Sequence, residues 1–82
     1  MKSFGTRELV ALLEELGYSK GKQIASRHLK YHCPKKVPEG IHTFILVIQG
    51  RREYDPYWQR TYIKQIKAHG FTQEEIELNF GK

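Results

Sequence analysis

The chain has 82 residues, of which 39% are hydrophobic and 28% charged, and a formal net charge of +5. This length predicts one domain over residues 1–82, with a core too small to enclose a large cofactor. No apolar run approaches the roughly 20 residues that cross a bilayer. Acidic residues interrupt the first apolar repeat, unlike a secretory signal, and the lone Cys33 forms no internal disulfide. We therefore expect a cytoplasmic protein without membrane contact.

Basic residues gather in two stretches that hold no acidic residue. The first lies between Leu16 and Pro38 and contains Lys20, Lys22, Arg27, Lys30, Lys35 and Lys36. The second runs from Pro56 to Gln73 and contains Arg60, Lys64 and Lys67. Separate acid-free stretches on so short a chain indicate a polyanionic partner. The alternative is a solvated surface with an excess of lysine.

The first predicted element is a helix from Thr6 to Leu16. Its leucines recur at the spacing of one apolar helix face, at Leu9, Leu12, Leu13 and Leu16. Thr6 suits the N-cap, and Gly17 suits the left-handed residue that ends a helix. A turn is expected over residues 18–21.

Three strands are predicted next. Residues 22–24 suit a short edge strand. Residues 26–33 alternate, with Leu29, Tyr31 and Cys33 on the apolar face and His28, Lys30 and His32 on the other. After a turn over residues 34–40, the β-branched and apolar run within residues 41–48 favours a central strand.

A second helix begins at Asp55-Pro56, a cap residue followed by proline at the first helical position. Its expected buried stripe is Trp58, Tyr62, Ile63 and Ile66. Gly70 ends this helix, and Thr72 with Glu75 predicts a capping box for a short helical turn over residues 73–78. The chain is therefore expected to be α+β, of order αβββα, with two helices on one face of a three-stranded antiparallel sheet and a short C-terminal helical turn.

Three segments, taken in order and spacing, carry a resemblance to a known family. They are Met1-Lys2-Ser3-Phe4 with Arg7-Glu8-Leu9, Leu12-Leu13-Glu14 and Gly17-Tyr18; the stretch Gln-Ile-Ala-Ser-Arg-His-Leu-Lys-Tyr-His at 23–32; and the stretch Thr-Tyr-Ile-Lys-Gln-Ile-Lys-Ala-His-Gly-Phe-Thr at 61–72. They resemble the HicA toxins of toxin–antitoxin systems, whose signature strand usually reads Gly-Ser-His-His and whose closing helix has a Thr-Leu-x-x-Ile-Leu-Lys-x-Ala-Gly pattern. The likeness runs without gaps through residue 32 and is poor over residues 35–58.

The resemblance implies a fold like that of a double-stranded-RNA-binding domain. It also implies a metal-independent mRNA interferase, an endoribonuclease without a cofactor, that a HicB-like antitoxin neutralises. Arg27 stands where the family has its catalytic histidine, His28 stands at the second histidine, and Ala25 replaces the glycine.

Arg27 can bind phosphate but cannot act as a base, because the pKa of a guanidinium stays above about 12. His28 is therefore the candidate catalytic base, since a neutral imidazole accepts a proton near neutral pH. Neighbouring strand residues point to opposite faces, so His28 would act from the other face unless a bulge near residues 25–26 rotates the strand. A surface histidine on the open sheet face is the alternative.

Lys22, Arg27 and Lys30 are the phosphate-binding candidates of the strand region. Arg60, Lys64 and Lys67 form a stripe at i, i+4 and i+7 on the second helix, suited to RNA backbone contact or simply to solvation.

Tyr54 and Tyr57 suit base stacking or packing of the loop. A metal site is not expected, because His28 and His32 lie about 13 Å apart along a strand. The competing functions are a non-catalytic RNA-binding domain on the same scaffold and a protein-interaction module whose sheet takes an acidic partner.

Overall fold

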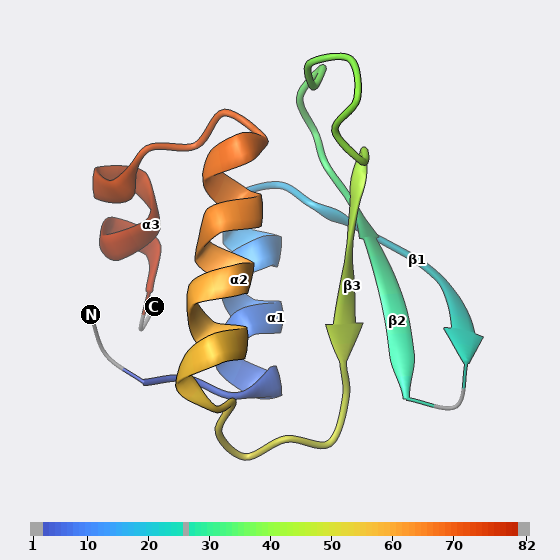
Figure 1. Ribbon diagram of the computed structural model, residues 1–82, viewed down its shortest axis with the longest axis vertical. Helices are drawn as coiled ribbons and strands as arrows, with labels where there is room; N and C mark the ends of the chain where they lie inside the picture. Colours follow the sequence, from blue (N-terminus) through green and yellow to red (C-terminus); the bar gives the residue numbers. More distant parts are fainter. Residues whose placement is uncertain (1–2, 26, 81–82) are drawn as a thin grey trace.

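The computed structural model describes residues 3–25 and 27–80 (Figure 1). Its elements, in chain order, are α1 (Thr6–Glu15), β1 (Ser19–Ala25), β2 (His28–His32), β3 (Phe44–Ile48), α2 (Pro56–Ala68) and α3 (Gln73–Asn79). The predicted α+β class and the order αβββα with a short closing helix are confirmed. Ser26, the predicted first residue of the middle strand, lies outside the described residues.

The sheet is antiparallel with strand order β1-β2-β3. Its β2–β3 register runs unbroken from the pair His28–Ile48 to the pair His32–Phe44. The β1–β2 register shifts twice, between Lys20 and Gln23 and again before Ala25. β1 is the edge strand that the sequence predicts, although it begins earlier, at Ser19.

The prediction of a central strand over residues 41–48 is wrong. β3 spans only Phe44–Ile48 and lies at the other edge of the sheet, while β2 is central. An apolar run usually marks a strand with neighbours on both sides. Here α2 and the segment before it cover half of the free edge, so an apolar edge strand is accommodated.

The core lies between the helices and one face of the sheet. Figure 1 shows α1 and α2 on the same side of β3, with α3 beyond them. Alternate strand residues enter this core, namely Leu29, Tyr31, Ile45 and Val47, and they meet the leucines of α1 and the buried face of α2 in one apolar cluster. The other sheet face carries Lys30, His32 and Leu46, and is open to solvent at His32 and Leu46.

Trp58 is not part of the buried stripe of α2, contrary to the sequence prediction. Tyr62, Ile63 and Ile66 are buried, whereas Trp58 is 36% exposed and packs at the start of the helix against Tyr62. Position 58 lies one turn before Tyr62, where the core has already been filled by Tyr54 from the preceding loop.

The helix ends follow the predicted signals with one exception. An Asp55 carboxylate oxygen accepts the Trp58 backbone N–H at 3.0 Å, and Thr72 and Glu75 form the predicted capping box. Gly70 has φ +99°, the left-handed conformation that glycine adopts without strain. Thr6, however, is the first helical residue rather than the cap, and its hydroxyl instead donates to the Ile48 carbonyl at 2.7 Å.

Hydroxyl groups cover the outer edge of β3 at its C-terminal half. The Tyr62 hydroxyl donates to the Leu46 carbonyl at 2.8 Å and accepts the Ile48 N–H at 3.0 Å. The Tyr54 hydroxyl joins Thr6 in donating to the Ile48 carbonyl, at 2.6 Å. Burial raises the pKa of Tyr62, so its hydroxyl keeps its proton and donates throughout the physiological pH range. These bonds fasten α2 to the sheet.

We expect Tyr62→Phe to lower the free energy of unfolding by about 1–3 kcal/mol, because the Leu46 carbonyl and Ile48 N–H would both lose their partner. Urea and thermal denaturation would measure this loss. Tyr57→Phe is the matched control, since Tyr57 is 63% exposed on the same helix and should change stability by less than about 0.5 kcal/mol. Equal stability of the two variants would contradict the role given to the Tyr62 hydroxyl.

Candidate nucleic-acid interface

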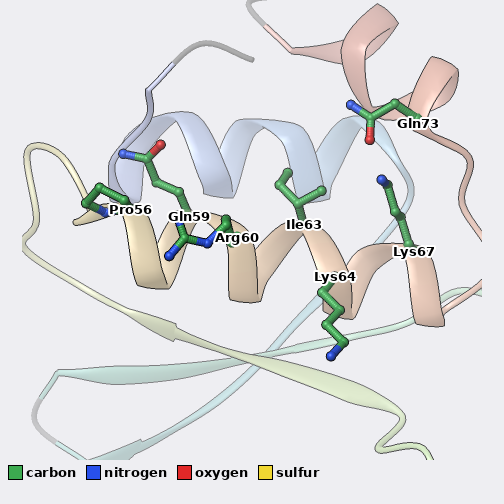
Figure 2. A pocket seen from close by; sticks show the side chains of 7 residues that line it. All are labelled: Pro56, Gln59, Arg60, Ile63, Lys64, Lys67 and Gln73. Atoms are coloured by element: carbon green, nitrogen blue, oxygen red, sulfur yellow. The ribbon is translucent and has the colours of Figure 1, made fainter.

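The basic stripe predicted on the second helix exists on α2. Arg60, Lys64 and Lys67 are all exposed and line a surface hollow of about 480 Å³. Figure 2 shows Lys67 pointing toward Gln73 of α3, while Lys64 points the opposite way, toward the sheet. The stripe therefore lines an open hollow where α2 and α3 meet, and one of its lysines turns to the other side of the helix.

A second hollow, of about 390 Å³, lies where α2 passes the N-terminal half of β3. Two elements and the residues next to them line this hollow. Thr61, Lys64, Gln65 and Ala68 come from α2, Phe44 and Leu46 from β3, residues 40–42 from the segment before β3, and His69 from the end of α2. Lys64 lines both hollows. The basic surface of the helix is thus continuous with an apolar depression beside the sheet.

Phe44 is the centre of an aromatic and cationic cluster at this second hollow. The Lys30 ammonium lies over its ring, 4.1 Å from the centroid. The His42 ring is 5.3 Å away and the His32 ring 6.5 Å away, centroid to centroid. Lys30 and His32 come from β2, so the cluster carries the positive charge of the sheet to the edge of the hollow lined by Lys64.

Sequence reasoning missed Phe44 and His42 as candidate site residues. Every residue from Phe44 to Ile48 is apolar, so no alternation marked which side chains leave the core. In the structure Ile45 and Val47 are buried, whereas Leu46 is 40% exposed. The pairing with β2 would have shown which side chains of β3 leave the core. Lys30 pairs with Leu46 and His32 with Phe44, and paired residues lie on the same face of the sheet.

The remaining phosphate-binding candidates lie elsewhere. Lys22 is exposed on β1, and Arg27 is exposed in the turn before β2. Neither residue lines the two hollows. An Arg27 guanidinium nitrogen lies beside the backbone of Gly50, 3.4 Å from the position that a Cβ would take there. Of the six candidates, Arg60, Lys64 and Lys67 therefore line the same hollow. Lys30 lies near the second hollow, because its ammonium contacts the Phe44 ring that lines it.

His28 lies half-buried at the start of β2, on the open face that also carries Lys30 and His32. The bulge considered near residues 25–26 involves Ser26, which lies outside the described residues. The β1–β2 register shifts between Gln23 and Ala25, while the β2–β3 register is regular from His28 to His32. No rotation of β2 therefore brings His28 to the side of Arg27. Across the described residues, no group of three potential ligands is placed to hold a metal ion.

Tyr54 packs rather than stacks on a ligand, because it is 3% exposed against Tyr62 and Phe4. Tyr57 is exposed at the start of α2. Cys33 is half-buried against the core, and its sulfur accepts the Lys35 N–H at 3.4 Å.

A buried histidine closes one end of the second hollow. His69, 3% exposed, contacts the His42 carbonyl through Nε2 at 2.8 Å and the Tyr18 hydroxyl through Nδ1 at 2.6 Å. A carbonyl only accepts, so Nε2 carries the proton. Burial raises the pKa of Tyr18, so its hydroxyl keeps its proton while it is hydrogen-bonded to Nδ1. His69 thus ties the end of α2 to the segment that carries His42.

Comparison of the chain with protein-family models, with curated proteins and with solved structures finds no match. Within residues 3–25 and 27–80, no helix has both the length and the apolar character required to cross a membrane.

Replacing Tyr18 by Phe should lower the free energy of unfolding by about 1–3 kcal/mol, because the buried Nδ1 of His69 would lose its hydrogen-bond partner. It should also change the nitrogen chemical shift of His69 Nδ1, which NMR of the imidazole nitrogens would follow. Tyr31→Phe, at a similarly buried tyrosine on β2, is the comparison variant and should leave that shift unchanged. An unchanged Nδ1 shift in a folded Tyr18→Phe variant would refute the Tyr18–His69 hydrogen bond.

Proposed function

We propose that this protein binds RNA through the phosphate backbone, as an RNA-binding domain of the HicA kind. The observation that carries the proposal is the position of Lys64. It lines the basic hollow of α2 with Arg60 and Lys67, and it also lines the aromatic hollow whose Phe44 ring carries the Lys30 ammonium. Cations on a helix and on a strand therefore flank one continuous surface, as a phosphate chain requires.

The element order supports the resemblance that the sequence carries. An αβββα chain with a basic second helix suits contact with RNA phosphates, which dominate recognition of A-form RNA. Neutralisation by a HicB-like antitoxin, mRNA as the RNA bound and a cytoplasmic location belong to the same proposal. Each would follow from membership of that family.

RNA cleavage is the second candidate function, and His28 is the observation in its favour. Its imidazole lies on the open face with Lys30, so a proton acceptor and a cation share one surface. Arg27, at the family's catalytic position, supplies a phosphate contact but no base. Non-catalytic binding is therefore the primary proposal, and metal-independent endoribonuclease activity depends on His28 alone.

The affinity for RNA should fall steeply as salt rises, because bound phosphates release counterions. Changing Arg60, Lys64 and Lys67 together to Ala should weaken binding and reduce the slope of log affinity against log salt by about two to three. Fluorescence anisotropy across a salt series would measure both quantities.

The matched control removes the same charge elsewhere, through Ala at the exposed Arg7, Lys20 and Lys36. It should retain most of the slope. A flat salt dependence of the native protein would exclude the phosphate-binding proposal, and tight binding to an acidic protein with no affinity for RNA would favour the interaction-module alternative.

Incubation with RNA in EDTA tests the second candidate. If the native protein cleaves, His28→Ala should abolish cleavage, because no other base of suitable pKa stands beside it on the strand. Arg27→Ala should weaken binding or slow cleavage through the lost phosphate contact. Arg27→His should create or increase cleavage, since it restores the family's Ser-His-His sequence.

Gel analysis of the products separates the outcomes. Cleavage that survives His28→Ala would eliminate this histidine as the base. Cleavage only after Arg27→His would identify a scaffold that retains RNA binding without the native base, and no cleavage from either protein would leave binding as the sole function.

A further inference from the structure

We propose that the hollow between α2 and β3 holds one unpaired nucleobase, so that the RNA partner is bound as a single strand. This inference rests on the proposed RNA binding and adds the class of RNA and the place where a base is read.

Two hydrogen-bonded contacts delimit the hollow along β3. At one end the Tyr62 hydroxyl holds the Leu46 carbonyl and the Ile48 N–H. At the other end His69 Nε2 donates to the His42 carbonyl. Between these contacts, α2 lines the hollow with Thr61, Gln65 and Ala68. The Tyr62 and His69 contacts therefore close the two ends of the hollow, and α2 and β3 form its long sides. It remains open toward solvent and toward the open sheet face.

The strand edge inside this frame has free hydrogen-bonding groups. Residues 43 and 49 bond to β2, so the backbone groups of the even-numbered residues of β3 point away from β2 and toward α2. The hydroxyls of Tyr62, Tyr54 and Thr6 form hydrogen bonds with the Ile48 N–H, the Ile48 carbonyl and the Leu46 carbonyl. Among the hydrogen bonds of the described residues, none involves the Phe44 N–H, the Phe44 carbonyl or the Leu46 N–H. Two donors and one acceptor in a row match the polar edge of a nucleobase.

The frame is too short for an added peptide strand. From His42 to Leu46 the chain advances about 13 Å, whereas strands usually extend over about 17–20 Å. The contacts of Tyr62 and His69 would obstruct a longer segment at both ends. A volume of about 390 Å³ suits one planar heterocycle with its sugar.

Aromatic and charged groups complete the site. Phe44 and His42 present neighbouring rings, 5.3 Å apart. The Lys30 ammonium covers one face of the Phe44 ring, so a base would stack on the ring surface that remains toward the hollow. Lys64 stands at the rim that leads to Arg60 and Lys67, where the phosphates on either side of the base would lie. A base enters such a hollow only when it is released from a duplex, because a paired base stays stacked between its neighbours.

The test compares four probes by fluorescence anisotropy or its competition form. They are a single-stranded RNA of about ten nucleotides, the same strand in a perfect duplex, the strand with abasic sites, and adenosine monophosphate. We expect the native protein to bind the single strand at least about fivefold more tightly than the duplex or the abasic strand, since stacking of one base contributes about five- to 150-fold. The mononucleotide should bind more weakly than the strand, because it lacks the phosphates that reach Arg60 and Lys67.

Two variants act on the hollow by different routes. Phe44→Leu keeps an apolar strand residue but removes the ring, and Ala68→Phe fills the hollow from an exposed position on α2. Both should lower single-strand affinity by about five- to 150-fold and leave duplex affinity unchanged. Tyr57→Leu removes an exposed aromatic ring outside the hollow and should leave single-strand affinity unchanged. Thermal unfolding would verify the fold of each variant, and Ala68→Phe decides the matter if Phe44→Leu unfolds.

The outcomes separate this inference from the proposed function. Equal affinity for single strand and duplex, or full affinity in a folded Ala68→Phe variant, would overturn the base site while RNA binding stands. Adenosine monophosphate binding as tightly as the strand would overturn the assignment to RNA and identify a free-nucleotide site. Failure of the native protein to bind any RNA would remove the proposed function itself.

Discussion

The arrangement of this small domain depends on the hydroxyl of Tyr62. It donates to one backbone group of β3 and accepts from another, so a helix is fixed to the free edge of a sheet by polar contacts as well as by packing. An unpaired backbone group in this half-buried position would cost about 1–3 kcal/mol. The same contact sets how far α2 stands from β3, and with it the width of the hollow that lies toward Phe44. The Tyr62 hydroxyl therefore contributes both to the stability of the fold and to the position of one end of the hollow.

The surface chemistry follows from where the charges fall once the chain is folded. The buried apolar residues form one cluster between the helices and the sheet, and the basic residues of α2 lie on the surface. Lys30 is drawn out of solvent over Phe44, and a cation held on an aromatic ring gains about 0.5–2 kcal/mol. Lys35 makes the equivalent contact with Phe71 and donates to the Gly70 carbonyl at 3.0 Å. Part of the positive charge thus also stabilises the fold, while the exposed stripe of α2 and Lys30 beside Phe44 remain at the surface proposed for the ligand.

Local signals in the sequence predicted most of the fold and part of the site. The leucine spacing, the Asp55-Pro56 start and the Thr72–Glu75 box each specify a helix through contacts within a few residues, and all three are confirmed. The place of β3 at the edge depends on Tyr62, which reaches the strand from α2 by tertiary packing. The exposure of Trp58 depends on Tyr54, which comes from the loop before the helix and fills the core there, so helical periodicity could not reveal either feature. The α2 stripe was readable because helical spacing alone assembles it. The hollow beside Phe44 was not, because residues 40–46 and 61–69 meet only through tertiary packing.

The apolar strand Phe44–Ile48 would by itself be a hazard in solution. It has no charge, no proline and no glycine, and it stands at a sheet edge, which is the composition and placement of a segment that pairs with copies of itself into aggregates. Natural edge strands usually carry a lysine, a proline or a bulge against this. Here the hydroxyls of Tyr62, Tyr54 and Thr6 occupy the backbone groups at one end, and His69 ties down the carbonyl just beyond the other. What is left exposed between them is too short to template a second strand, so this edge of the sheet is protected from self-templated fibre growth without a charged residue in β3.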